Sequence, residues 1–331
     1  MILAGDVGGT KTRLALFHPD GSPRQPVREQ RVVSRDFPSL EALVSAFLET
    51  GGERVSAAVF GIAGPVVANR CETTNLPWSM DGASLGERLG VARVRLVNDL
   101  AATGWGLPLL APAEVEVLQA GSPAPGNRAL IAAGTGLGEG LLVWDGTSHR
   151  PVASEGGHAD FGPRDPLEDE LNVWMRAKYG RVSYERILSG PGLADLYRFM
   201  TATGRGHEPA ETASRFADDP DPARTVTAAA LDGSCERAAL TLDRWIRIYG
   251  AEAGNLALKA LAVNGLYVGG GIAPRIAALL RRGEFTAVFR EKGRLRPVLE
   301  SIPITLVLDD RTALWGAAAY AFALHSGREA S

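Results

Sequence analysis

The chain lacks the sequence features that mark disulfide-rich, zinc-binding, membrane-spanning and secreted proteins. Its 331 residues include only two cysteines, Cys71 and Cys235, which are too few and too far apart for a disulfide framework, a zinc site or a redox pair. No apolar run reaches the ~18 residues of a membrane span. Met1 leads directly into strand-forming residues, without the basic segment and cleavage site of a signal peptide. These absences predict a cytoplasmic protein with no membrane partner.

An excess of charge of one sign is also missing. The 35 basic and 38 acidic residues give a net charge of −3, so there is no general electrostatic reason to bind nucleic acid. The hydrophobic content of 45% and the charged content of 22% are those of an ordinary globular protein. At roughly 100–200 residues per domain, this length predicts two domains.

Glycine, by contrast, is plentiful, with 39 residues, and it marks several turns, the first of which lies in residues 2–17. An apolar run leads into Gly-Asp-Val-Gly-Gly-Thr, a second apolar run follows, and a Pro-Asp-Gly turn ends it, which predicts a β-hairpin. Gly8 and Gly9 allow positive φ and let backbone N–H groups approach an anion. Asp6, at the end of the first strand, is placed to hold a hydrated Mg²⁺ beside that anion. An ordinary hairpin with a glycine turn is the alternative.

A Walker A loop is a second interpretation of the same residues. Gly5–Thr12 comes close to G-x-x-x-x-G-K-[ST], with Thr10 where the last glycine should stand. That loop must also begin a helix. Only the six residues Thr12–Phe17 separate it from the following turn, which is too short for an ordinary helix. The Walker A interpretation is therefore rejected.

The same pattern of strand, glycine turn and strand recurs about one domain later in the sequence. Apolar residues 129–133 lead into Gly134-Thr135-Gly136-Leu137-Gly138, and a second strand-like run follows at 140–144. The glycine spacing resembles a dinucleotide loop, but strand residues stand where a Rossmann helix should begin. Two hairpins of this kind can face each other from two domains and clamp a polyphosphate. This repetition is the most informative feature of the sequence.

The remaining pattern alternates strands and helices, which predicts an α/β protein with mixed sheets. The expected strands are 31–34, 56–63, 94–97, 266–268 and 303–308, and the expected helices are 39–48, 85–89, 171–179, 193–200, 240–261, 275–282 and 313–325. The segment 105–128 contains four prolines and marks a change of domain, and 204–224 is expected to be a surface excursion. A third glycine turn, at 269–271, allows a flat ring to lie against the backbone, which indicates a nucleoside site.

Polar side chains follow several of these elements. Asn98 and Asp99 stand where a strand ends, the usual place for ligand groups in open α/β sheets, although an Asx turn or a helix N-cap is the alternative. Glu155 and His158 flank two glycines, and could equally belong to a surface loop. Glu185 could simply pair with a neighbouring arginine on a helix surface. Together with two phosphate-binding turns, these groups describe a pocket for a polyol.

These motifs resemble the bacterial glucokinase family. The resemblance rests on Asp6–Leu16, Val97–Leu100, Gly134–Gly138, Ser154–His158, Val182–Gly192 and Val268–Arg275, and it runs in order along essentially the whole chain. Related sugar kinases and repressors of the ROK group carry a cysteine-rich zinc motif after their histidine. Residues 159–170 contain neither cysteine nor histidine, so the chain is placed on the non-ROK branch and no structural zinc is expected.

The resemblance implies a role for each matching residue. Asp99 would be the general base for the C6 hydroxyl of glucose, and Asp6 would position Mg²⁺ through water. The glucose-binding residues would be Asn98, Asp99, Glu155, His158 and Glu185. The nucleotide-binding residues would be Asp6, Gly8, Gly9, Thr10, Lys11, Thr12, Gly134, Thr135, Gly136, Gly270 and Gly271. Lys11 departs from family members with Asn there, which puts a specific contact from its side chain in doubt.

The resemblance also implies a fold and an activity. The fold would be the two-domain actin-like (ribonuclease H-like) ATPase fold, with duplicated mixed sheets flanked by helices. The small domain would comprise residues 1–107 and 312–331, and the large one 108–311. The enzyme would be a homodimeric glucokinase that uses ATP and Mg²⁺ in the first step of glycolysis. A kinase of another hexose and a nucleotide-switched ATPase related to actin or chaperones are the alternatives.

Overall fold

The computed structural model describes residues 1–49, 51–52, 54–73 and 76–327, and the chain folds as two compact units. Unit 1 comprises Met1–Glu114, Gly140–Ala153 and Asp309–Ser331, and unit 2 comprises Val115–Glu139 and Ser154–Leu308. The first division, between Glu114 and Val115, falls inside the proline-rich segment 105–128. The domain boundaries expected from the sequence stay a prediction.

Unit 1 is built on a mixed sheet of five strands in the order β3-β2-β1-β4-β7. The strands are β1 (Ile2–Val7), β2 (Lys11–Phe17), β3 (Arg28–Val33), β4 (Ala57–Ile62) and β7 (Val94–Asn98). β1 and β2 form the predicted antiparallel hairpin, and β4 and β7 continue the sheet in parallel. A separate antiparallel pair, β5 (Arg70–Glu72) and β6 (Ser79–Asp81), was not expected from the sequence.

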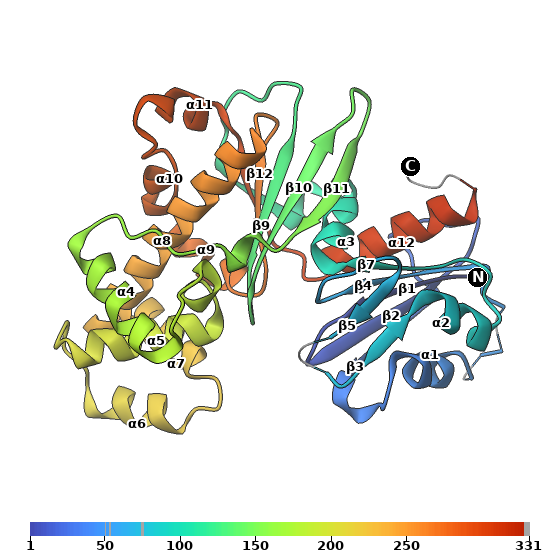
Figure 1. Cartoon of the computed structure of the whole chain (residues 1–331), viewed down its shortest axis with the longest axis horizontal. Helices are drawn as coiled ribbons and strands as arrows, with labels where there is room; N and C mark the ends of the chain where they lie inside the picture. Colours follow the sequence, from blue (N-terminus) through green and yellow to red (C-terminus); the bar gives the residue numbers. More distant parts are fainter. Residues whose placement is uncertain (50, 53, 74–75, 328–331) are drawn as a thin grey trace. The chain divides into compact units, whose positions relative to one another are not determined.

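Helices cover both faces of this sheet (Figure 1). They are α1 (Leu40–Glu49), α2 (Gly82–Leu89), α3 (Asp99–Gly106) and α12 (Thr312–His325). Alternate residues of β1 and β2 point to opposite faces. Leu3 and Leu14 belong to the apolar core with α1 and α2, whereas Ile2 and Phe17 belong to the core with α12. The last helix therefore packs on the first sheet.

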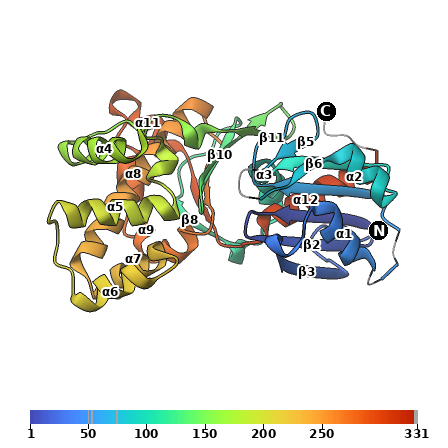
Figure 2. The ribbon, with the colours of Figure 1, turned by 60° about the horizontal axis from the view of Figure 1, so that its bottom comes forward.

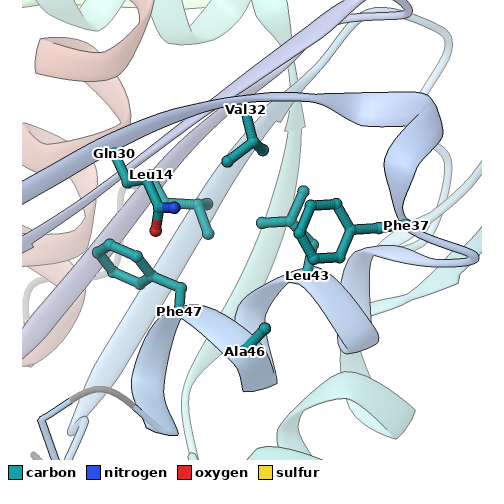
Figure 3. Close-up of a pocket in the computed structure, with 7 residues that line it drawn as sticks. All are labelled: Leu14, Gln30, Val32, Phe37, Leu43, Ala46 and Phe47. Atoms are coloured by element: carbon teal, nitrogen blue, oxygen red, sulfur yellow. The ribbon is translucent and has the colours of Figure 1, made fainter.

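A small apolar pocket of about 80 Å³ lies between this sheet and α1 (Figure 3). Its lining residues are Leu14, Gln30, Val32, Phe37, Leu43, Ala46 and Phe47. Ligand sites for small molecules are typically ~300–1,000 Å³. The pocket is too small for a sugar or a nucleotide, and none of the predicted site residues lines it.

The second sheet has six strands in the order β11-β10-β9-β12-β13-β8. These are β8 (Val115–Gln119), β9 (Arg128–Ala133), β10 (Leu137–Trp144), β11 (His149–Ser154), β12 (Leu266–Gly269) and β13 (Ile304–Val307). β9, β12 and β13 are parallel, and β8 pairs antiparallel at the edge. The repeated strand–glycine turn–strand pattern is confirmed. β8 and β11 were not predicted, because β8 is a short run inside the proline-rich segment 105–128 and β11 contains a proline among polar residues.

Most of the helices that the structure describes belong to unit 2 (Figure 2). They are α4 (Pro166–Tyr179), α5 (Gly190–Ala202), α6 (Ala210–Asp218), α7 (Pro222–Leu231), α8 (Glu236–Ala260), α9 (Ala277–Leu280), α10 (Glu284–Phe289) and α11 (Arg296–Ser301). The long helix α8 is the centre of this group, with Trp245 and Tyr249 fully buried. The segment 204–224 lies at the surface, as expected, because nearly all of its residues are exposed or half-buried, but it is mostly helical rather than a loop. Those residues form α6 and the start of α7, which Pro222 begins at a position that favours proline.

Candidate functional site

The first glycine turn is held by a network inside unit 1. Gly8 N donates to Lys11 O at 3.0 Å. Ser34 Oγ donates to Gly8 O at 2.7 Å and lies 3.0 Å from Thr12 Oγ1. Thr12 is fully buried, so its hydroxyl holds the turn, whereas Thr10 and Lys11 are exposed. A direct phosphate contact from Thr12 stays a prediction.

The conformation expected for this turn is wrong in one respect. Neither Gly8 nor Gly9 is among the described glycines with positive φ. Glycine is nevertheless useful here, because a Cβ on Gly8 would lie 3.0 Å from the Lys11 carbonyl oxygen. The space above the turn, rather than a left-handed backbone, explains the residue type.

Asp6 lies on β1 directly opposite Arg13 on β2. Burial raises the pKa of Asp6 to about 6, and the nearby Arg13 charge opposes this shift. The positive charge of Arg13 is shared with two other carboxylates. Its guanidinium donates to both oxygens of Asp310 at 3.3 and 3.1 Å and lies 3.6 Å from Glu29. The Arg31 charge also lowers the pKa of Asp6 and the Asp310 charge raises it, but burial outweighs both arginines, so a further cation beside the carboxylate would be favourable. Arg13 and Asp310 were missed by sequence reasoning.

Within the described residues, no group of three or more His, Cys, Asp or Glu side chains is arranged around a common metal position. Mg²⁺ commonly binds one or two carboxylates and takes its other ligands from water and substrate phosphates. Asp6 beside the glycine turn fits that pattern. It would hold the ion, and the ion would neutralise charge on the phosphates.

Asn98 and Asp99 stand at the junction of β7 and α3. Asn98 caps the helix, because its Oδ1 accepts hydrogen bonds from Leu100 N at 2.9 Å and Ala101 N at 3.3 Å. Its Nδ2 donates to Gly64 O at 3.2 Å. The N-cap alternative is therefore confirmed for Asn98, and sugar binding by its remaining donor stays a prediction. Asp99 is the half-buried first residue of α3, where the helix dipole favours a carboxylate.

The second glycine turn adjoins the third one inside unit 2. Ile272 N donates to Ala133 O at 3.1 Å, and a Cβ on Gly134 would lie 3.8 Å from Gly271 N. Gly270 has a φ of +84°, and a Cβ there would lie 2.3 Å from Ala133 O, so only glycine fits. Gly271 faces open space. The structure thus brings together two turns that the sequence assigned to one nucleotide.

Glu155, His158 and Glu185 also come together, although Glu185 is distant in sequence. His158 Nε2 lies 3.8 Å from Glu155 Oε2, and its Nδ1 lies 3.8 Å from Glu185 Oε1. Backbone hydrogen bonds between residues 159–161 and 182–184 bring the two segments side by side. All three side chains are partly exposed, with 55%, 56% and 31% exposure for His158, Glu155 and Glu185. They can therefore reach a ligand.

Glu185 is also bonded to the second glycine turn. Its Oε2 accepts a hydrogen bond from Leu137 N at 3.0 Å, and a Cβ on Gly136 would lie only 2.4 Å from the same oxygen. Gly190 N, at the start of α5, donates to Gly134 O at 2.8 Å. The Glu185 carboxylate thus contacts both His158 and the second glycine turn.

Among the described residues, no helix is long and apolar enough to cross a membrane.

The predicted site residues divide into two groups according to the unit in which they lie. Asp6, the first glycine turn, Asn98 and Asp99 belong to unit 1. The other two turns, Glu155, His158 and Glu185 belong to unit 2. The clamp of two facing hairpins stays a prediction.

Comparison with known proteins follows the whole length of the chain. A family model described as Glucokinase matches residues 3–324. The glucokinase of Synechocystis sp. is 42% identical over 96% of both chains. Among solved structures, glucokinase from an Antarctic psychrotroph is 31% identical, with a TM-score of 0.80, and the match covers 97% of this chain and 98% of that one.

A more distant structure shares the fold. A ROK family glucokinase from Streptomyces griseus, solved with glucose and AMPPNP, is 21% identical, with a TM-score of 0.66 over 97% of this chain and 98% of that one. The paired mixed sheets flanked by helices are those of the actin-like ATPase fold, as expected. With a matching model over nearly every residue and a relative at 42% identity, the chain belongs to the glucokinase family.

Proposed function

We propose that this protein is an ATP-dependent glucokinase, which transfers the γ-phosphoryl group of MgATP to the C6 hydroxyl of glucose and releases glucose 6-phosphate and ADP. The observation that carries the proposal is the Glu185 carboxylate, which contacts His158, beside Glu155, and Leu137 N of the second glycine turn. Membership of the glucokinase family supports the same assignment. Glucose and AMPPNP in the ROK glucokinase are consistent with these substrates.

Asp99 is the proposed general base. Its carboxylate accepts the proton of the C6 hydroxyl as that oxygen attacks the γ-phosphorus and the bond from phosphorus to the ADP oxygen breaks. Asn98, Glu155, His158 and Glu185 hold the other hydroxyls of the sugar and orient the attacking oxygen. Phosphoryl transfer is catalysed mainly by positioning and by stabilising charge, which these groups supply without a covalent intermediate.

The nucleotide is assigned to the glycine turns. Backbone N–H groups around Gly8, Gly9 and Thr10, and around Gly134–Gly136, bind the phosphates, and Gly270–Gly271 lies against the adenosine. Asp6 holds Mg²⁺ through water.

We also infer a homodimer in the cytoplasm. Both cysteines are buried free thiols, which suits a reducing compartment. The oligomeric state is tested separately by analytical ultracentrifugation.

The decisive experiment measures ATP consumption with and without sugar. A coupled assay over glucose, mannose, N-acetylglucosamine and fructose should show ATP turnover that depends on glucose and is highest with it. Turnover with another hexose at much higher kcat/KM would replace glucose as the substrate. ATP hydrolysis that is unaffected by every sugar would instead support the nucleotide-switched ATPase and sink the kinase.

A further inference from the structure

A buried carboxyl group that the proposed mechanism does not use stands directly after the second glycine turn. Glu139, the third residue of β10, is 1% exposed. Its Oε1 has no hydrogen-bond partner among the described residues. An ionised carboxylate in that position would be strongly destabilising, because burial removes water without supplying a donor.

One side of Glu139 lies against the turn that carries Glu155 and His158. A Cβ on Gly156 would lie 2.3 Å from Glu139 Oε2, so this carboxyl group fills the space beneath the glycine. Ser154 Oγ donates to Glu139 O at 3.1 Å and accepts from Gly156 N at 3.0 Å. The position of the turn therefore depends on both the backbone and the side chain of Glu139.

The other neighbour of Glu139 is a second buried carboxyl group, Glu252 on α8, which is fully buried. Glu252 has donors of its own. Asn255 Nδ2 donates to its Oε2 at 2.7 Å, and Lys259 Nζ donates to its Oε1 at 3.3 Å. Because Glu252 is supplied with donors and Oε1 of Glu139 is not, the ionised member of the pair is Glu252. The proton belongs on Glu139, which can then donate to Glu252.

The electrostatic surroundings agree with this assignment. Burial first, and then the Glu252 charge, raise the pKa of Glu139 to about 8, while Lys259 opposes the shift. Tyr249, also on α8, is a further titratable group that faces Glu139. Tyr184 and Lys292 face Glu252, and Arg164 lies close to both of them.

We propose that Glu139 is a positioning residue for the sugar site, which carries the single proton of a buried pair with Glu252 and thereby holds the Gly156–Gly157 turn so that Glu155 and His158 are presented to the sugar. This inference rests on the proposed function, because it assigns the turn to glucose. When the proton is lost, two buried negative charges repel each other and the turn moves. Glucose binding weakens as a result.

The first experiment measures glucose affinity by calorimetry from about pH 7 to about pH 9.5 in the wild type and in Glu139→Gln. The wild type should bind glucose roughly tenfold more weakly at the alkaline end, a typical coupling between two sites. Glutamine keeps a donor toward Glu252 and does not ionise in this range, so Glu139→Gln should lack this loss. Glu211→Gln, an exposed position on α6, is the control and should follow the wild type. Equal pH profiles for Glu139→Gln and the wild type would overturn the proposal.

The second experiment measures thermal unfolding without ligand. A carboxyl group whose pKa is higher in the folded state contributes stability that is full at acid pH and is lost as pH rises through the folded value. Between about pH 5 and pH 8.5, the Tm of Glu139→Gln should therefore rise by at least ~4 °C relative to the wild type. A constant Tm difference would overturn the proposal even if glucose binds. A Tm difference that grows with pH in a protein that binds no glucose would contradict the proposed function but would still support the shared proton of Glu139 and Glu252.

A second variant covers the case in which Glu139→Gln does not fold. Glu252→Gln removes the neighbouring charge and offers an amide donor to an ionised Glu139. The pH dependence of Tm and of glucose affinity should then move to lower pH. If both profiles stay where they are in the wild type, Glu252 is not the partner and the proposal fails.

Discussion

Asp99 and Asn98 are adjacent in sequence, but their side chains have different roles. The Asn98 side chain caps α3, whereas Asp99 begins the helix and is proposed as the base. Asp99→Asn should lower kcat by roughly 10²–10⁴, because general base catalysis contributes about that factor. The helix should keep its stability, since the Asn98 cap is unchanged. Steady-state kinetics and circular dichroism test this, with the exposed Asp20→Asn as control. Near-normal turnover would remove Asp99 from the role.

Glu185 offers a pair of matched substitutions that separate its two contacts. Glu185→Gln keeps an oxygen that can accept from Leu137 N but removes the charge beside His158. We expect a higher KM for glucose and an unchanged KM for ATP.

Glu185→Ala removes both contacts and leaves the Leu137 N–H without its partner, which costs about 1–3 kcal/mol. Here the KM for ATP should rise as well, by about fivefold or more. Initial rates measured over both substrates decide the matter. If the two variants have the same KM for ATP, the bond to the turn has no part in nucleotide binding.

The crossing of α3 and α12 shows how packing determines residue type within a helix. A Cβ on Gly316 would lie 1.7 Å from Ala102 O, and one on Gly106 would lie 2.1 Å from Thr312 O. The two helices can approach this closely only because both positions are glycine. Close approach of α12 to α3 in turn places the helix against β1 and β4 in the apolar core.

Gly316→Ala should therefore destabilise the protein by at least about 1–3 kcal/mol, the usual cost of overpacking, despite the better helix propensity of alanine. Ala313→Ser, on the half-buried first turn of the same helix, should change stability by less than ~0.5 kcal/mol. Chemical denaturation measures both. An unchanged or raised stability in Gly316→Ala would show that the helices can separate without cost.

For the molecule as a whole, turnover should depend on a divalent cation, although the described residues offer no cluster of metal ligands. Removing Mg²⁺ with a chelator should abolish phosphoryl transfer while leaving the Tm of the ligand-free protein unchanged. Asp6→Asn should raise the Mg²⁺ concentration needed for half-maximal rate by roughly 10–100-fold, the usual effect of losing an outer-shell ligand. Isothermal titration of Mg²⁺ in the presence of ATP provides a second readout. A wild-type Mg²⁺ requirement in Asp6→Asn would take Asp6 out of the metal site.

The sequence by itself determined the repeated hairpin and the alternation of strands and helices. These depend on glycine spacing and apolar periodicity, which are local and survive in the primary structure. The family followed from the resemblance of its motifs to those of the bacterial glucokinases, which the comparisons confirm. The sequence did not determine α6, because Gly204–Arg224 has a loop-like composition, and packing of Phe216 against Tyr197 supplies what propensity does not.

Only the tertiary structure decided which polar residues meet. The contact of Glu185 with Leu137 N, the bidentate pair of Arg13 and Asp310, and the shared burial of Glu139 and Glu252 each join segments that are far apart in the chain. In the sequence, Glu139 is only a glutamate beside the apolar run 140–144, and its burial became visible in the structure. The charge state of Glu139 depends on Glu252 and on the donors that Glu252 receives, Asn255 and Lys259, and all three residues stand on a helix more than a hundred residues away in sequence.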